Sequence, residues 1–185
     1  MSFTPTKIEG VTLVEPTLHA DDRGFFFESY HQRRYQEAGL DSYFVQDNHS
    51  KSGHATLRGL HTQIETPQTK LVRVIEGRVW DVAVDIRIGS PTFGQYVGAE
   101  LSAENKKQLY IPSGMLHGFV VLSEEAQVEY KCSGFYDPAS ELTVRWDDSD
   151  LAIDWPLNSP VLSERDANAS SFSEIIQRLP RPTAE

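Results

Sequence analysis

Several features that mark particular classes of protein are absent or scarce in this sequence of 185 residues. It contains one cysteine, Cys132, so no disulfide can form within the chain. No apolar stretch approaches the roughly 20 residues of a membrane-spanning helix. The first ten residues contain neither the basic segment nor the apolar segment of a signal peptide. We therefore expect that the protein does not associate with a membrane and that it is located in the cytoplasm.

Positive charge is also scarce. The chain has 17 Lys and Arg residues against 27 Asp and Glu residues, which gives a net charge of −10. Proteins that bind nucleic acids or anionic membranes gain affinity by neutralising phosphates, and this chain carries the opposite net charge. The sequence thus predicts no nucleic-acid partner, and any anionic ligand needs a local cluster of cations.

The remaining composition is that of an ordinary folded protein. Hydrophobic residues make up 39% and charged residues 24% of the chain, which excludes a wholly disordered polypeptide. The length suits one domain, and no repeat, linker or low-complexity tract divides it. We predict a single domain over residues 1–185.

Short apolar runs separated by turn residues predict a mostly β structure. Turn chemistry recurs at segments such as Gly89-Ser90-Pro91 and Pro112-Ser113-Gly114. The runs lie at the spacing of about 8–12 residues that is typical of sandwiches and barrels. The predicted strands are Val11–Val14, Gly24–Tyr30, Phe44–Val45, Leu71–Ile75, Val79–Ile86, Leu109–Ile111, Phe119–Leu122, Val128–Phe135 and Leu142–Trp146.

The clearest of these strands is Val79–Ile86. Its large apolar residues alternate with Asp81, Ala83 and Asp85, so Trp80, Val82, Val84 and Ile86 share one face. Such alternation favours an antiparallel sheet.

Two segments have helical character. Residues 30–38 contain good helix formers and end before Gly39, and Ser171 with Glu174 forms a capping-box pattern ahead of Ile175, Ile176 and Leu179. Many short strands with two peripheral helices favour an all-β jelly roll or barrel.

Six histidines raise the question of a metal site. His61 is followed by Thr62 and Gln63, so the second imidazole of a His-x-His pair is missing. His117 follows a tight turn that can present it at the start of a strand. The ligand set falls short of a catalytic metal centre, and we predict no metal.

The densest polar cluster contains Gln46-Asp47-Asn48, then Arg58 and His61, then Lys70. Taken singly, Arg58 and Lys70 read as solvated cations at strand edges, and His61 reads as a structural histidine. A base, two cations and two amides within 25 residues favour a functional site instead.

Several ordered motifs occur along the chain, namely Asp22-Arg23-Gly24-Phe25-Phe26-x-Glu28, Gln46-Asp47-Asn48-x-Ser50, Leu57-Arg58-Gly59-Leu60-His61, Lys70-Leu71-Val72-Arg73, Gly89-Ser90-Pro91-Thr92-Phe93-Gly94, Ile111-Pro112-x-Gly114-x-x-His117-Gly118-Phe119, Tyr130-Lys131-Cys132 and Trp155-Pro156. In order and spacing, these motifs resemble those of the dTDP-4-dehydrorhamnose 3,5-epimerase family, and the resemblance extends from about Ile8 to about Asp166.

The resemblance implies a cupin-like jelly-roll β-sandwich with a few short peripheral helices. It also implies a homodimer without metal or cofactor, in which an N-terminal strand joins the partner's sheet and Arg23 reaches the partner's site. The implied reaction inverts C3 and C5 of dTDP-4-dehydro-6-deoxy-D-glucose to give dTDP-4-dehydro-L-rhamnose. Both carbons lie next to the C4 ketone, so an enolate forms and needs stabilisation.

The resemblance also implies roles for individual residues. His61 is the base, Tyr130 the acid, Asp166 the carboxylate that pairs with His61, and Lys70 the cation beside the enolate oxygen. Tyr136 stacks on the thymine. The other residues implied around the nucleotide sugar are Arg23, Glu28, Gln46, Asp47, Asn48, Arg58, Lys70, His117, Glu141 and Arg165.

Two positions depart from the usual family pattern. Thr62 stands where an aromatic residue is more common, and Arg165 stands where lysine often precedes the carboxylate. The first affects packing near the sugar and the second keeps the charge. Fine specificity is therefore open, but the reaction class is not.

Three other functions stay open. An epimerase acting at C3 or C5 alone would use the same base and acid. A metal-dependent cupin oxygenase is disfavoured by Gln63, and a non-catalytic nucleotide-sugar binder is disfavoured by the retained base, acid and cation. Metal analysis separates the oxygenase from the others, and incorporation of solvent deuterium separates an epimerase from a binder.

Overall fold

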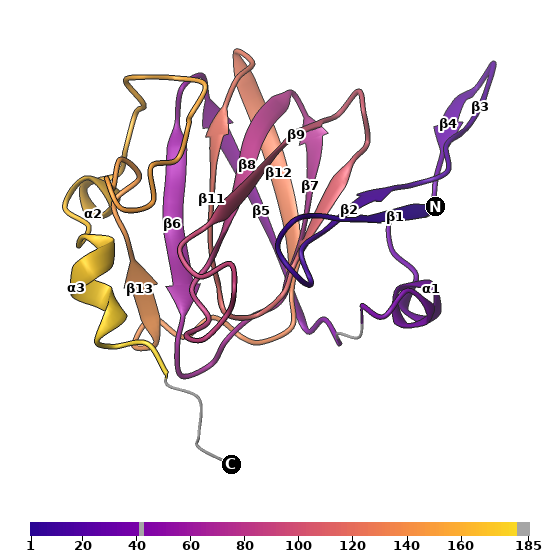
Figure 1. Ribbon diagram of the computed structural model, residues 1–185. Coiled ribbons are helices and arrows are strands. Elements are labelled where there is room, and N and C mark those ends of the chain that lie inside the picture. The colour runs from indigo at the N-terminus through magenta and orange to yellow at the C-terminus, as the bar shows by residue number, and fades with distance from the viewer. Residues whose placement is uncertain (41–42, 181–185) are drawn as a thin grey trace.

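Two antiparallel sheets, packed face to face, organise the computed structural model, which describes residues 1–40 and 43–180 (Figure 1). The six-stranded sheet has the order β1-β2-β10-β7-β12-β5, and the five-stranded sheet has the order β13-β6-β11-β8-β9. The strands of the first are β1 (Ser2–Pro5), β2 (Thr12–Glu15), β10 (Gln108–Ile111), β7 (Lys70–Glu76), β12 (Glu125–Cys132) and β5 (Gln46–Gly53). Those of the second are β13 (Glu141–Thr143), β6 (Leu57–Gln63), β11 (Met115–Val121), β8 (Arg78–Asp85) and β9 (Tyr96–Ser102).

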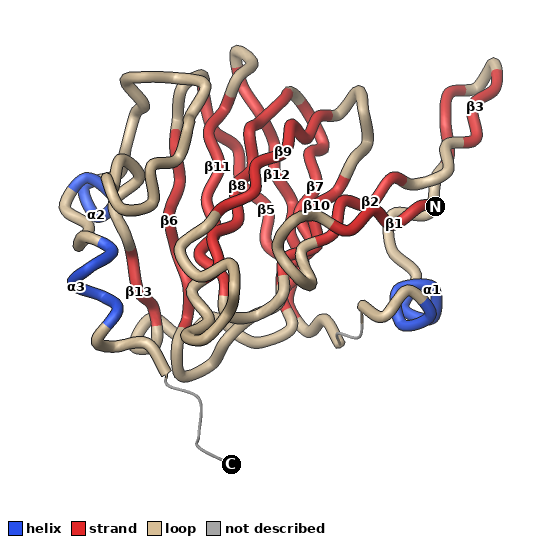
Figure 2. The backbone as a smooth tube through the Cα atoms, viewed as in Figure 1, coloured by secondary structure: helices blue, strands red, loops and turns tan. Residues whose placement is uncertain are grey.

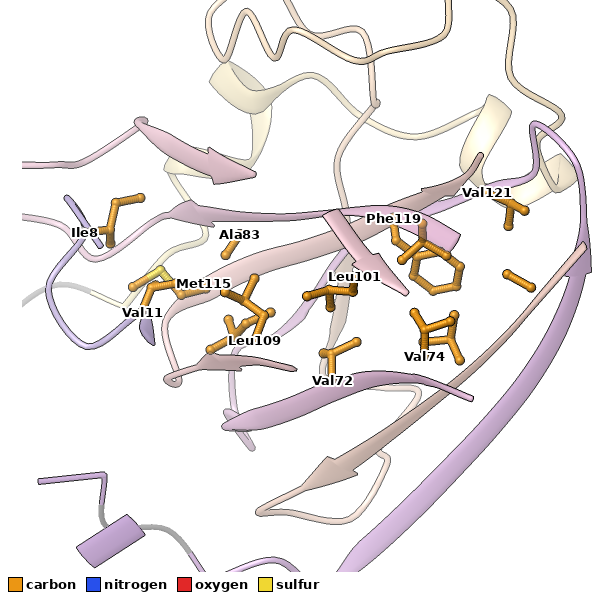
Figure 3. Packing of buried hydrophobic residues seen from close by; sticks show 14 residues of the cluster. Ile8, Val11, Val72, Val74, Ala83, Leu101, Leu109, Met115, Phe119 and Val121 are labelled. Carbon is orange, nitrogen blue, oxygen red and sulfur yellow. The ribbon is translucent and has the colours of Figure 1, made fainter. Parts of the chain in front are cut away.

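An apolar core fills the space between the two sheets (Figure 3). Val72 and Leu109 enter it from the six-stranded sheet, and Ala83, Leu101 and Phe119 enter it from the five-stranded sheet. Because strand residues alternate in direction, the neighbours of these residues face outward on each sheet.

A second apolar core covers the outer face of the five-stranded sheet, and we call it the outer core. Leu60, Val82 and Leu116 of the sheet pack there with Trp155 and Phe172 of the C-terminal segment. That segment contains the short helices α2 (Glu164–Ala167) and α3 (Phe172–Ile176), which lie beside β6 and β13 (Figures 1 and 2). Ser171 and Glu174 form the predicted capping box of α3.

The N-terminal part adds two smaller features. Helix α1 (Gln32–Glu37) packs Tyr35 on the outer face of the six-stranded sheet, next to Leu71 and Tyr110. Strands β3 (His19–Asp21) and β4 (Gly24–Phe26) form a hairpin that projects away from the sandwich (Figure 1). Phe25 and Phe26 on this hairpin are exposed.

The predicted cupin-like jelly-roll β-sandwich with a few short helices is confirmed. The alternation predicted for Val79–Ile86 is also confirmed, and β8 pairs antiparallel with both of its neighbours. Its acidic face does not meet solvent, since Asp81 and Asp85 are fully buried on the side facing the other sheet. No helix in the described ranges is long and apolar enough to span a bilayer.

Candidate active site

A cavity of about 710 Å³ lies between the two sheets, lined by strands of both and by residues 161–166 of the C-terminal segment. Strands β5, β7 and β12 form one wall, and strands β6, β11 and β13 form the other. Most of the predicted site residues line this cavity, namely Gln46, Asn48, Arg58, His61, Lys70, His117, Tyr130, Tyr136, Glu141, Arg165 and Asp166.

His61 and Asp166 form a hydrogen-bonded pair at the five-stranded wall. The Nε2 atom of His61 lies 2.7 Å from Oδ1 of Asp166, whose side chain is 4% exposed. Ser163 caps helix α2 by accepting a hydrogen bond from the backbone N–H of Asp166, which holds the carboxylate in place. Burial raises the pKa of Asp166, but the hydrogen bond from His61 and the nearby charges outweigh it, so the pKa is lowered. The pair therefore contains an ionised carboxylate that can orient the imidazole and stabilise its charged form.

Lys70 and Tyr130 stand on the opposite wall, on β7 and β12 of the six-stranded sheet. The Nζ atom of Lys70 lies 5.9 Å from the centre of the Tyr130 ring. In the ranges 1–40 and 43–180, no carboxylate lies within ion-pair distance of this ammonium group. Burial lowers the pKa of Lys70 and raises the pKa of Tyr130. The cation is thus available to a ligand, and the phenol keeps its proton.

His117 is held by a carboxylate that the sequence did not single out for function. Nε2 of His117 lies 2.9 Å from Oδ2 of the fully buried Asp81. The other oxygen of Asp81 has no hydrogen-bond partner in the described structure. An acidic residue inside the Val-rich strand β8 was the available signal, since buried carboxylates are rare unless they are paired.

Arg165, Glu141 and Tyr136 form a polar network in the cavity. Arg165 pairs with Oε2 of Glu141, and the hydroxyl of Tyr136 donates to the same oxygen at 2.9 Å. Nη2 of Arg165 is also 3.1 Å from Nε2 of His61. The network joins β13, the loop before it and helix α2 around the base.

Strand β5 separates the Gln46-Asp47-Asn48 motif onto two faces. Gln46 and Asn48 line the cavity, and their side chains are joined by a hydrogen bond of 2.9 Å. Asp47 points to the other face of the sheet, where it pairs with Lys131 at 3.0 Å. Because alternate residues face opposite sides of a strand, the side chain of Asp47 cannot join its neighbours in the cavity. Its predicted contact with substrate is not supported by this position.

Two further predicted residues, Arg23 and Glu28, do not line the cavity of their own chain. Arg23 sits on the β3–β4 hairpin, its side chain 89% exposed and paired with Asp21. Glu28 pairs with Arg34 of helix α1 at 3.0 Å.

Gln63 and Ser52 have supporting positions that the sequence did not reveal. Gln63 donates to Thr66 and to the carbonyl of Phe135 and accepts from the N–H of Asp137, so it pins the loop that carries Tyr136. Ser52 accepts a hydrogen bond of 2.9 Å from Nε of Arg58. Long-range partners of this kind are visible only once the chain is folded.

No group of three or more metal-ligating side chains occurs in the part of the chain that the structure describes. Gln63 stands at the position where a cupin metal site would place a second ligand. Its side chain is hydrogen-bonded to backbone groups of the neighbouring loops. The cavity offers instead a base, an acid and a cation, which are the groups that proton transfer next to a ketone requires.

Comparison with known proteins agrees with this chemistry. A sequence profile of the dTDP-4-dehydrorhamnose 3,5-epimerase family matches residues 5–174. A protein of that name from Pseudomonas aeruginosa is 55% identical over 94% of this chain and 97% of its own length. A dTDP-4-dehydrorhamnose 3-epimerase from Streptomyces niveus is 42% identical over 94% of this chain and 85% of its own length.

A solved structure is similarly close. The dTDP-6-deoxy-D-glucose-3,5-epimerase of Legionella pneumophila, in complex with dTDP-4-keto-L-rhamnose, aligns with a TM-score of 0.94 and 50% identity. The alignment covers 99% of each chain. The family match spans nearly the whole sequence, and the chain therefore belongs to the dTDP-4-dehydrorhamnose 3,5-epimerase family and is an epimerase.

Proposed function

We propose that this epimerase inverts C3 and C5 of dTDP-4-dehydro-6-deoxy-D-glucose through an enolate, with His61 as base, Tyr130 as acid and Lys70 beside the ketone oxygen. The product is dTDP-4-dehydro-L-rhamnose, an intermediate of dTDP-L-rhamnose synthesis. The observation that carries the proposal is the placement of His61 and Tyr130 on opposite walls of one cavity.

Inversion requires that placement. A proton removed from one face of the sugar ring must be replaced from the other face, or the original configuration returns. His61 belongs to the five-stranded sheet and Tyr130 to the six-stranded sheet, so a ring held between the sheets meets one group on each side.

The electrostatics of the cavity support the intermediate. Removing a proton next to the ketone puts negative charge on its oxygen, and stabilising that charge is usually the largest catalytic contribution. Lys70, which has no carboxylate partner in the described ranges, provides a positive charge for this oxygen. Asp166 stabilises the imidazolium that His61 becomes.

The remaining lining residues suit the nucleotide. Arg58 and Arg165 bring positive charge to a chain of net charge −10, and a guanidinium matches phosphate oxygens in two hydrogen bonds. Tyr136 is half exposed in the cavity and presents a ring for stacking on thymine. Gln46, Asn48, His117 and Glu141 add hydrogen-bonding groups.

Solvent exchange tests the proposal directly. In D₂O the enzyme should exchange the protons at C3 and C5, and NMR should resolve the two positions. His61→Ala should reduce exchange and product formation by about 10²–10⁴-fold, the range typical of a general base, while dTDP still binds. Activity within threefold of the parent would remove His61 from its role.

A C3-specific epimerase is the second candidate, because the Streptomyces niveus relative is named a 3-epimerase. The same experiment decides between the two. Exchange at C3 without exchange at C5 would make the chain a C3 epimerase. Exchange at both, with L-configured product, supports the main proposal.

We infer also that the enzyme acts as a homodimer in which Arg23 serves the partner's cavity. Arg23 is exposed on a projecting hairpin, away from the cavity of its own chain, and Phe25 and Phe26 beside it are exposed apolar rings (Figure 1). Pairing with a second copy would cover these rings and add a cation near the diphosphate.

Mixing two inactive variants tests this arrangement. After Arg23→Ala and His61→Ala chains are refolded together, about half of the dimers should be mixed and each should hold one intact site. Activity should recover to roughly a quarter of the parental value. No recovery despite verified exchange of subunits would leave Arg23 acting within its own chain.

The single domain over residues 1–185 and the cytoplasmic location stay predictions.

A further inference from the structure

Arg58 and His61 lie on the same wall of the cavity although they are three residues apart on β6. In a regular strand, residues three apart face opposite sides of the sheet. The same irregularity affects their neighbours, because Leu57 and Leu60 both pack in the outer core. Strand β6 therefore contains an interruption between residues 58 and 61.

The pairing of β6 with β11 locates that interruption. His61 pairs with His117, and Arg58 pairs with Phe119. Two residues of β6, Gly59 and Leu60, thus stand opposite the single residue Gly118 of β11, which is the definition of a β-bulge. The extra residue reverses the alternation of β6 once and brings Arg58 and His61 to the same face.

Two glycines meet at this bulge. A Cβ atom on Gly59 would lie 2.7 Å from the Cα of Gly118 and 2.7 Å from the carbonyl oxygen of His117. A Cβ atom on Gly118 would lie 2.8 Å from the carbonyl oxygen of Arg58. These contacts are with backbone atoms, so a side chain at either position would push the two strands apart. Gly59 also has a φ of +119°, a conformation that other residues rarely adopt.

The other edge of β6 holds the bulge in register. The backbone N–H of Leu60 donates to the carbonyl of Val144 at 3.1 Å, and the N–H of Val144 donates back to Leu60 at 2.9 Å. Leu60, which lies in the bulge opposite β11, therefore has both its backbone N–H and its carbonyl hydrogen-bonded to Val144. A displacement at the glycines would be transmitted to β6 itself.

We propose that Gly59 and Gly118 are positioning residues, whose paired lack of Cβ atoms permits the bulge that places Arg58 and His61 together in the cavity. The proposal rests on the function proposed above, in which His61 is the base and Arg58 binds the diphosphate. It extends that function to two residues that touch no substrate.

Gly118→Ala is the test variant, because Gly118 lies outside the left-handed region and alanine adds only the steric contact. Gly98→Ala is the matched control. Gly98 lies on β9 of the same sheet, and a Cβ atom added to it would lie 2.4 Å from the Trp80 ring. Neither Gly98 nor Trp80 lines the cavity. Both variants should have lowered melting temperatures, and both are assayed well below them.

Only Gly118→Ala should lose function while folded. A misplacement of about 1 Å can cost about 100-fold in rate, so kcat should fall by about that factor, and the dissociation constant for dTDP should rise. The His61 Nε2–H signal in ¹⁵N NMR, assigned with His61→Ala, should shift in Gly118→Ala and stay in Gly98→Ala. A folded Gly118→Ala enzyme with kcat within threefold of the parent and an unchanged His61 signal would overturn the proposal.

A measurement on the parent protein covers the case in which Gly118→Ala does not fold. Saturation with dTDP-glucose, which has no ketone and does not react, should shift the side-chain ¹⁵N signals of both Arg58 and His61. The methyl signals of Leu60, which does not line the cavity, should not move. A response of Leu60 in place of His61 would show regular alternation and overturn the bulge. If the parent fails to exchange C3 and C5 protons but these signals behave as described, the proposed function fails and the positioning stands.

Discussion

Replacing Asp166 with asparagine isolates the contribution of its negative charge. The carboxylate is 4% exposed and accepts from Nε2 of His61 at 2.7 Å. Asparagine keeps the shape and one accepting oxygen, so the imidazole can keep its orientation, but the charge that stabilises the imidazolium is lost. A hydrogen bond to a charged group contributes about 1.5–3 kcal/mol against about 1 kcal/mol for a neutral one. The difference of about 0.5–2 kcal/mol predicts a fall in kcat of about 2–30-fold.

The assay is turnover of the dTDP-linked ketosugar with NMR detection of deuterium at C3 and C5. Asp147→Asn is the control, because Asp147 makes a surface ion pair with Arg145 outside the cavity, and its activity should stay within twofold. His61→Ala should lose more activity than Asp166→Asn. A folded Asp166→Asn enzyme with kcat within twofold of the parent, or with a loss equal to that of His61→Ala, would refute the reasoning.

Three more predictions concern Tyr130, Asp81 and Asp85. Tyr130→Phe keeps the ring and removes the donor, so solvent-deuterium washout should outrun product formation, and equal losses in both would argue for a structural role. Asp81→Asn weakens the hydrogen bond that orients His117, so KM for the nucleotide sugar should rise about 5–30-fold at a nearly constant kcat. An unchanged KM would show that His117 has no role in binding the substrate. Asp85 is fully buried, and although burial raises its pKa, hydrogen bonds from Arg87, Ser90 and Thr92 lower it overall from the ordinary 3.8. The stabilisation that the ionised Asp85 gives the fold is therefore complete above its ordinary pKa of 3.8, and it is lost as the pH falls below that value. Asp85→Asn should destabilise the fold by about 2–3 kcal/mol in urea unfolding at pH 7 and by less at pH 3, and an equal effect at both values would contradict the assignment.

Most strands of the apolar core could be predicted from the sequence because their pattern is local, although β9, which supplies Leu101, was not among those predicted. The alternation in β8 and the turn residues around it depend on neighbours a few positions apart, and the structure keeps both. The capping box of α3 is local in the same way. Family motifs, which record residue types in order, also pointed to most of the side chains that line the cavity.

Strand β5 shows where local patterns fail. Residues 46–53 are polar throughout and read as a loop, yet they form a strand of eight residues. One face meets the polar cavity through Gln46 and Asn48, and the other carries Asp47 and Lys51, which pair with Lys131 and Glu125. A strand with two polar faces has no apolar alternation, so only its pairing with β12 reveals it.

The sequence by itself determined the residue types of the site, the all-β class and the family. The family resemblance also implied that Asp166 pairs with His61, and the fold brings these two residues together across 105 positions. Tertiary structure alone decided that the buried Asp81 holds His117. It also decided that Asp47 leaves the cavity while Arg58 and His61 share one wall. The physical reason is that side-chain direction depends on strand pairing and on a bulge allowed by two glycines, and these contacts join residues far apart in the chain.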